Sequence, residues 1–172
     1  MPHLEDKPLE GRRAAVMVGP LFEDIEALYP LYRSTSGDTV EGKKGQLLDV
    51  EQAADDLLAD DLDLVVIAGG YGPDKLRTDD GVLRLVRELN EQDKPIAFIC
   101  HAGWVPASAG IVRGRVATSA PSIADDLRNA GAEWKDAEVV VDGNLVSSRG
   151  PGDLPAFMRA TIELAARTPT VV

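Results

Sequence analysis

The chain has 172 residues, 44% of them hydrophobic, and a formal net charge of −11. This length suits one domain with a substantial core, so we expect a single domain over residues 1–172 with tails at 1–11 and 168–172. The acidic surface would repel nucleic-acid phosphates and anionic lipid, which excludes both as expected partners. No segment approaches the roughly 20 apolar residues that cross a bilayer, and the polar N-terminus MPHLEDKPLEGRR is neither a signal nor a transit peptide.

The cysteine and histidine content excludes two further kinds of site. A single cysteine cannot form an intramolecular disulfide, which suits a reducing cytoplasm. The soft metal ligands are His3, Cys100 and His101, which are too few for a structural zinc cluster. We therefore expect a cytoplasmic protein without a metal or cofactor, whose one thiol is reactive or inert according to its surroundings.

The first half of the chain alternates apolar runs with helical patterns. Residues 23–33 have helical spacing interrupted by Pro30, and residues 34–45 (STSGDTVEGKKG) are rich in turn formers. Residues 50–61 predict a short helix, and residues 79–92 predict an amphipathic helix capped by Asp79 or Asp80. The following short apolar runs predict buried strands: 14–18, 62–70 and 94–100.

The second half continues the alternation. A helix is expected after Cys100, ending near residues 109–114, and then RVATS (115–119) as a fourth strand. PSIADDLRNAG (121–131) predicts a helix with a serine cap and a glycine stop. Asp-Gly-Asn at 142–144 predicts a β-hairpin over about residues 138–149, and residues 152–167 predict the closing helix.

Strands that alternate with helices predict an α/β fold, a flavodoxin-like three-layer sandwich with a mainly parallel sheet and helices on both faces. The continuous apolar character of VVIAGG and PIAFIC favours strands that are covered on both sides. In such sheets the ligand crevice lies at the carboxyl ends of the strands. Gly70, Cys100 and the segment after Val18 all fall at that edge.

Cys100 stands between a predicted strand and a predicted helix, in the stretch PIAFICHAGW. A sharp turn there would expose the sulfur and aim backbone N–H groups at whatever the sulfur attacks. The positive end of the following helix would favour thiolate, so we expect a lowered thiol pKa. The alternative is a small buried hydrophobic residue, which is the common role of a lone cysteine.

His101 is the candidate base, because His3 falls in the expected N-terminal tail. Alternatively, His101 points away from the cleft and supplies its backbone N–H alone. Three acidic residues near strand ends could assist the histidine: Glu23, Asp24 and Asp74.

A resemblance becomes specific when the motifs are taken together. They are FEDIE, LVVIAGGYGPDKLR, KPIAFICHAGW, SAGIVRGRVATS and DDLRNAGAEWKDAEVVVDGNLVSSRGPGDLPAF. In this order they resemble the ThiJ/PfpI superfamily, whose broad fold is that of class I glutamine amidotransferases, and are closest to its intracellular-protease and general-stress-protein branch. The likeness extends from about residue 13 to residue 164.

The resemblance implies a role for each matching position. Cys100 would be the elbow nucleophile in a strained backbone conformation, and His101 the base. Glu23 would be a protonated carboxyl beside the thiol, and Gly70 with the His101 N–H would form the oxyanion hole. Asp74 falls where the branch commonly has a glutamate that reaches the histidine of a neighbouring subunit, which implies a homo-oligomer.

The resemblance also leaves two alternatives for the N-terminal half. Relatives usually have another strand between the first helix and the GKxG turn, here GKKG, and STSGDTVE is too short for it. Either a strand has been lost or a segment is missing from the sequence.

The implied activities start with thiolate attack on a carbonyl carbon of a small carbonyl or peptide substrate. They are peptide hydrolysis, removal of glyoxal-derived adducts, and conversion of methylglyoxal to lactate without a cofactor. The alternative is a redox sensor in which Cys100 is oxidised to sulfinate. A glutamine amidotransferase is disfavoured, because no histidine follows His101.

Overall fold

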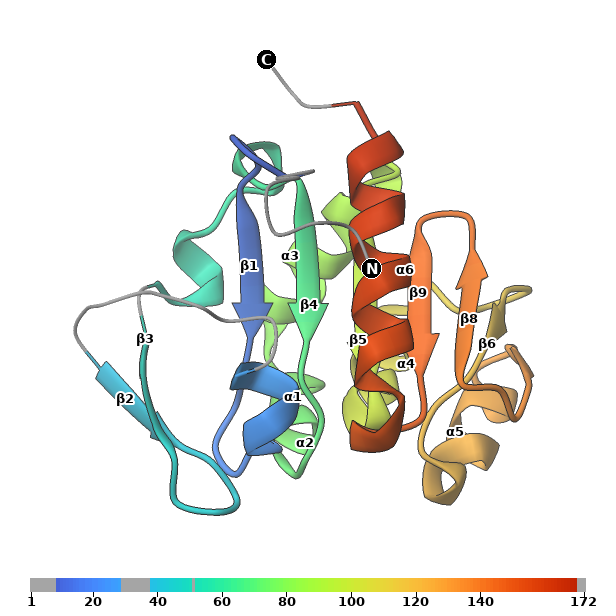
Figure 1. Cartoon of the computed structure of the whole chain (residues 1–172), viewed down its shortest axis with the longest axis horizontal. Coiled ribbons are helices and arrows are strands. Elements are labelled where there is room, and N and C mark those ends of the chain that lie inside the picture. The colour runs from blue at the N-terminus through green and yellow to red at the C-terminus, as the bar shows by residue number, and fades with distance from the viewer. Residues whose placement is uncertain (1–8, 29–37, 51, 170–172) are drawn as a thin grey trace.

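A five-stranded sheet forms the middle of the molecule (Figure 1). The computed structural model describes residues 9–28, 38–50 and 52–169. The strands in spatial order are β1 (Ala14–Met17), β4 (Leu64–Ile67), β5 (Ile96–Ile99), β9 (Leu145–Ser148) and β8 (Val139–Asp142). The first four are mutually parallel, and β8 pairs antiparallel with β9 through the predicted hairpin.

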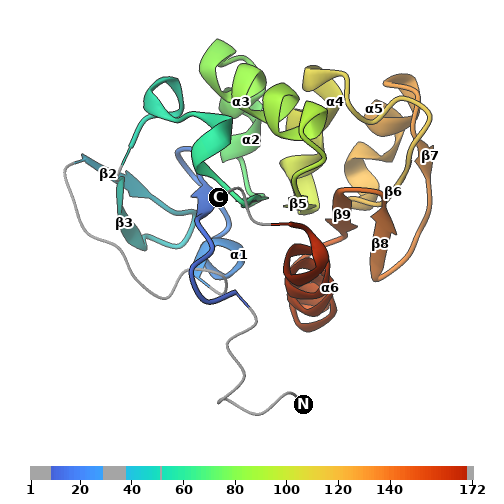
Figure 2. The same ribbon diagram turned by 90° about the horizontal axis from the view of Figure 1, so that it is seen from above.

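Helices cover both faces of this sheet, as Figure 2 shows from above. One face carries α1 and α6, and the other carries α2 to α5. Their bounds are α1 Asp24–Leu28, α2 Gly72–Leu76, α3 Asp80–Glu91, α4 Trp104–Ala109, α5 Ala124–Asn129 and α6 Leu154–Arg167. The predicted three-layer α/β fold is therefore confirmed, and Asp79 is the cap of α3, accepting the Val82 N–H at 2.9 Å.

Successive residues of the central strands contribute to opposite cores, as the pleat requires. Val65 and Phe98 belong to the cluster that includes Leu85 of α3. Val66 and Ala97 belong to the cluster that includes Phe157 of α6. Every residue of β4 and β5 is buried, which explains why their sequences are continuously apolar rather than alternating.

Two smaller sheets lie outside the main one. The first is a hairpin of β2 (Asp38–Glu41) and β3 (Leu47–Val50) around the GKKG turn. The second pairs β6 (Val116–Ala117) with β7 (Glu133–Trp134) in parallel. The strand predicted at residues 115–119 is present but is limited to the two residues of β6, which pair with β7 and lie outside the central sheet.

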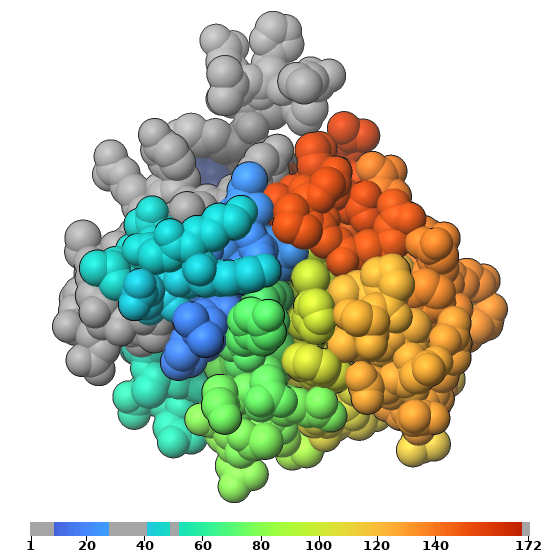
Figure 3. Space-filling view, turned by 90° about the horizontal axis from the view of Figure 1, so that it is seen from below, coloured from blue at the N-terminus to red at the C-terminus, as the bar shows by residue number. Residues whose placement is uncertain are grey.

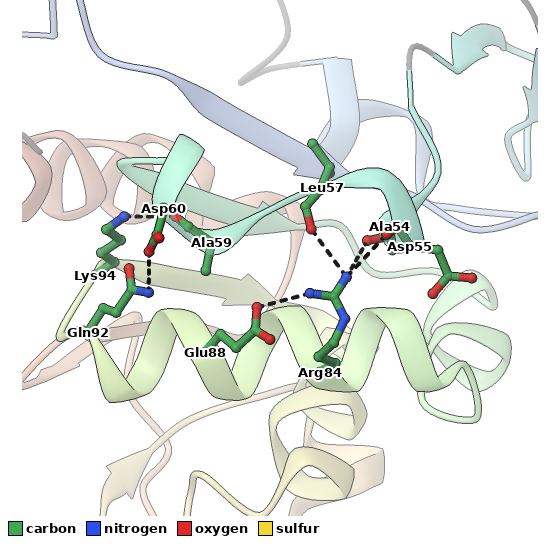
Figure 4. Close-up of polar contacts among 9 residues, drawn as sticks. All are labelled: Ala54, Asp55, Leu57, Ala59, Asp60, Arg84, Glu88, Gln92 and Lys94. Atoms are coloured by element: carbon green, nitrogen blue, oxygen red, sulfur yellow. Dashed lines mark hydrogen bonds and ion pairs between the residues drawn. The ribbon is translucent and has the colours of Figure 1, made fainter.

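The predicted helix over residues 50–61 is replaced by two single 3₁₀ turns, Ala54–Asp56 and Ala59–Asp61. Short 3₁₀ turns leave carbonyl groups without partners, and side chains of α3 and the residues after it supply the donors (Figure 4). Arg84 Nη2 donates to the carbonyls of Ala54 and Leu57 at 3.0 and 3.1 Å. Lys94 Nζ donates to the carbonyl of Ala59 at 2.7 Å.

Within the described residues, β1 forms one edge of the main sheet, with β4 as its neighbour. The segment between α1 and the GKKG turn, expected to be too short for a strand, does contain β2, which pairs with β3 and not with the main sheet. Pro30 and residues 29–37 are outside the described residues. Of the expected tails, Leu9 packs against the core beneath α6, and the Thr168 carbonyl accepts a hydrogen bond from Arg12 at 2.6 Å.

Candidate active site

Figure 3 looks onto the end of the molecule where the parallel strands finish. Residues near 100 (yellow-green) lie at the centre of this face. Around them are segments near residues 20–25 (blue), 40–48 (cyan), 70–76 (green), 120–128 (gold) and 150–158 (orange-red). The predicted meeting of Gly70, Cys100 and the segment after Val18 occurs at this edge.

The backbone turns sharply at Cys100, directly after β5. Cys100 has φ 61°, in the left-handed region that residues with a Cβ rarely adopt. A 3₁₀ turn over Cys100–Gly103 leads from it into α4. The neighbouring Gly69 permits the close packing, since a Cβ there would lie 2.7 Å from Cys100 Cβ. The strained elbow implied by the family resemblance is thus present.

Two backbone N–H groups act on the sulfur. Those of Gly70 and His101 both lower the pKa of the Cys100 thiol. Gly70 has φ 82°, and a Cβ there would lie 2.6 Å from the Leu21 carbonyl oxygen, so the close approach of the β1–α1 and β4–α2 loops requires glycine. That these two N–H groups form an oxyanion hole stays a prediction.

Glu26 is a site residue that the sequence analysis missed. Its side chain is fully buried, and its Oε2 accepts the Gly69 N–H at 2.8 Å. Its Oε1 is buried without a hydrogen bond of ordinary geometry, and the Cys100 thiol is the side chain that interacts with this carboxyl. Burial raises the pKa of Glu26 to about 7, although the Gly69 N–H acts in the opposite direction.

The expectation of a lowered thiol pKa is wrong. Burial raises the pKa of Cys100 to about 12, and the negative charge of Glu26 raises it further, against the lowering effect of the two N–H donors. Glu26 and Cys100 are therefore a coupled pair with one shared negative charge between about pH 7 and about pH 12. The reactive microstate is the one with the proton on Glu26 and the charge on sulfur.

His101 lies beside the thiol. Its Nδ1 is 3.2 Å from Cys100 Sγ and its Nε2 is 3.1 Å from Ser122 Oγ. The edge of its ring meets Trp104, with the two centroids 5.3 Å apart. Burial lowers the pKa of His101, and the Lys43 charge lowers it further, which favours the neutral imidazole. Ser122, predicted as a helix cap, contacts His101 instead, and α5 begins two residues later.

Glu23 does not occupy the place beside the thiol that the sequence analysis gave it. Its carboxylate pairs with Lys43 and Lys44 of the β2–β3 turn, at 3.6 and 3.4 Å. The physical reason is its position before α1, which turns it toward that hairpin. Glu26 lies within α1, and it is fully buried together with its neighbour Ala27. The acidic residues of FEDIE carry no local signal that separates Glu26 from Glu23.

Asp74 lies on α2 and is exposed. Within the described residues, the His101 ring contacts Cys100, Ser122 and Trp104.

The described ranges contain no group of three or more His, Cys, Asp or Glu side chains suited to a metal ion. Across those same ranges, no helix combines the length and apolar character that a membrane span needs.

Comparison with known proteins identifies the family. The model of the DJ-1/PfpI family matches residues 12–164. The chain belongs to the DJ-1/PfpI family. It is 43% identical to a deglycase of Thermococcus kodakarensis over 154 residues, which is 83% of this chain and 93% of that one. It is 36% identical to general stress protein 18 of Bacillus subtilis over 168 residues, 90% of this chain and 98% of that one.

Solved structures agree with this membership. The crystal structure of Drosophila melanogaster DJ-1beta superposes with a TM-score of 0.80 at 28% identity, covering 91% of each chain. The resemblance to the ThiJ/PfpI superfamily that the sequence motifs indicated is therefore confirmed.

Proposed function

We propose that this DJ-1/PfpI protein is a thiol-dependent hydrolase of the deglycase type, which releases amines from adducts of small dicarbonyl compounds. The observation that carries the proposal is the geometry at Cys100. A strained elbow holds the sulfur between two backbone N–H donors and next to a buried carboxyl. The similarity to deglycases supports this choice among the activities that such an elbow can perform.

The first step uses the coupled pair. Glu26 holds the proton while the Cys100 sulfur forms a bond to the carbonyl carbon, and the carbonyl electron pair moves to oxygen. The N–H groups of Gly70 and His101 then stabilise this oxyanion. In enzymes of this kind, removing one such donor typically lowers the reaction rate by about 100-fold or more. Glu26, which holds the proton at this stage, is the group that can return it to the oxyanion.

The overall reaction balances without a cofactor. An amine adduct of methylglyoxal and one water give the free amine and lactate. The former aldehyde carbon is oxidised as the former ketone carbon is reduced, so no external oxidant or reductant is consumed. In the second half, the His101 imidazole, whose lowered pKa favours the neutral form, can take a proton from the attacking water and pass it to the departing amine.

The test compares the wild type with Cys100→Ser on three substrates: a methylglyoxal adduct of a blocked lysine, free methylglyoxal, and casein. We expect amine and lactate release from the adduct by the wild type, and none by Cys100→Ser. The adduct is presented preformed and free dicarbonyl is removed, so that consumption of methylglyoxal cannot imitate deglycation. Turnover of casein alone would overturn the proposal in favour of peptide hydrolysis.

Oxidation of Cys100 is the second candidate, favoured by the buried carboxyl beside the sulfur. An oxygen of the sulfinate would accept a hydrogen bond from the protonated Glu26 carboxyl. Intact-mass measurement after peroxide treatment reports it. Uptake of two oxygens by the wild type, none by Cys100→Ser, and no turnover of any substrate would support a redox sensor.

A further inference from the structure

We propose that Lys43 is an anion-recognising residue of the Cys100 site, and that the carbonyl compounds this site prefers carry a carboxylate. The substrate class rests on the proposed function, whereas the role of Lys43 in binding an anion does not. It follows from how the β2–β3 turn is fixed and from the charges that the turn presents.

The turn is attached firmly to the loop that precedes α1. The Lys43 N–H donates to the Phe22 carbonyl at 2.8 Å. The buried Asp24 carboxylate accepts the N–H groups of Lys44 and Gln46 at 2.8 and 3.0 Å. A Cβ at Gly42 would lie 2.5 Å from Asp24 Oδ1, so glycine is required at this contact. The backbone of the turn therefore has a defined position relative to the site.

The two lysines of the turn have one carboxylate as their common ion-pair partner. The ammonium groups of Lys43 and Lys44 lie 3.6 and 3.4 Å from the Glu23 carboxylate. The Asp24 carboxylate also acts on Lys44, whose backbone N–H it accepts. Both lysine side chains remain substantially exposed, at 48% and 68%, so an incoming anion can reach them.

Lys43 is the lysine that faces the reacting groups. Its Nζ lies 5.8 Å from the ring centroid of Tyr71, the residue after Gly70. Its charge acts on both the His101 imidazole and the Glu26 carboxyl. Lys43 therefore stands where the far end of a substrate would lie while its carbonyl carbon meets Cys100.

The chemistry selects the substrate class. A carboxylate next to the carbonyl would gain a charge-assisted contact with Lys43, whereas a neutral dicarbonyl would gain nothing from it. In a chain with a net charge of −11, Lys43 would offset part of the repulsion that such a carboxylate meets.

The direct test alkylates Cys100 with iodoacetate and with iodoacetamide, which differ chiefly in charge. We measure the ratio of the two rates in the wild type, Lys43→Gln and Lys43→Arg. The matched control is Lys135→Gln, whose lysine is similarly exposed and paired with Glu133 on β7. Lys43→Gln should lower the ratio about fivefold at low ionic strength and less in concentrated salt. Lys43→Arg and Lys135→Gln should keep it.

An unchanged ratio in Lys43→Gln would overturn the proposal, as would an equal fall in Lys135→Gln. Thermal melting of each variant shows that it is folded, and iodoacetamide alone shows that the thiol is still accessible. Lys44→Gln should have the smaller effect of the two turn lysines.

A second measurement addresses the substrate class. Glyoxylate and glyoxal each add reversibly to a thiol, forming a carbon–sulfur bond while the thiol proton moves to the carbonyl oxygen. Each should protect Cys100 from iodoacetamide. In Lys43→Gln the half-protecting concentration of glyoxylate should rise about fivefold, and that of glyoxal should stay the same. Equal changes for both compounds would contradict the proposal.

The two proposals fail separately. If Lys43→Gln lowers the alkylation ratio but the wild type turns over no adduct, the deglycase function is wrong and the role of Lys43 stands. If the wild type and Lys43→Gln both release amine from the adduct and the alkylation ratio is unchanged, the role of Lys43 is wrong and the deglycase function stands.

Discussion

At Cys100 and Glu26, two acidic groups lie beside each other, with Glu26 fully buried and Cys100 partly buried. Neither group is suited to carry a charge by itself, because burial opposes ionisation of both. Together they lose one proton near neutral pH, and the location of the remaining proton decides whether the sulfur is nucleophilic. The proposed attack therefore requires that the thiol proton move to Glu26, because the pKa of the thiol itself is raised.

The rate of the proposed reaction should therefore depend on the pair. Below about pH 7 both groups are protonated, and above it the pair carries the charge that attack requires. We expect kcat/KM to rise with pH through about 7 in the wild type. Glu26→Gln removes the group that loses its proton near pH 7. In this variant kcat/KM should lack the rise near pH 7 and depend only on ionisation of the Cys100 thiol. A retained inflection near 7 in Glu26→Gln would show that another group controls the rate.

The same carboxyl should make the fold less stable as the pH rises. Its pKa is 4.5 when exposed and about 7 in the folded protein, so its contribution is full below 4.5 and is lost as pH rises through 7. This difference corresponds to about 3 kcal/mol. Glu26→Gln keeps an acceptor for the Gly69 N–H, and its free energy of unfolding should exceed that of the wild type by about 2–3 kcal/mol at pH 8. Urea titrations at pH 4 and pH 8 check this, and an equal difference at both pH values would refute it.

Among the elements, α3 holds the segment of 3₁₀ turns through side-chain donors. Arg84→Met would leave the carbonyls of Ala54 and Leu57 without their donor. We expect a loss of about 1–3 kcal/mol in the free energy of unfolding. Arg167→Met is the control, because its exposed 3.9 Å pair with Glu163 should contribute almost nothing. Similar losses in both variants in urea titrations would argue against this role of Arg84.

The sequence predicts those elements whose own pattern decides their structure. The runs at β4 and β5 are buried on both faces, and α3 has an aspartate cap and a regular apolar stripe. Residues 50–61 and 115–119 are decided by partners distant in the sequence. Arg84 and Lys94 stabilise the 3₁₀ turns, and β7 pairs with the short β6. Local propensity contains no information about such partners.

The candidate site divides in the same way. Cys100, His101 and Gly70 lie at strand ends, so the topology of a parallel sheet alone brings them together. Glu26 and Ser122 reach the site from helical segments, and only their orientation puts them there. Among several acidic residues in FEDIE, the sequence motif directed attention to Glu23, whereas helix geometry turns Glu26 inward.

At the scale of the whole molecule, Asp74 raises the question of whether one subunit contains the complete site. Its carboxylate is exposed on α2, as a group meant for a second subunit would be. If Asp74 acts across an interface, Asp74→Asn and Cys100→Ser should each be inactive. Mixing them under conditions of subunit exchange should recover about a quarter of the wild-type activity.

Two results would contradict this arrangement. Full activity of Asp74→Asn would remove Asp74 from the mechanism. Two inactive variants that fail to complement, although sedimentation shows mixed oligomers, would place its action within one subunit.

The anchoring of Gly42–Gln46 by Asp24 has a consequence for how this fold can diversify. The backbone there is secured by main-chain donors, so it does not depend on which side chains stand at positions 43 and 44. The side chains at those two positions can therefore change without moving the backbone next to the nucleophile. A lineage could exchange acidic for neutral or cationic substrates by two substitutions on a scaffold that need not move.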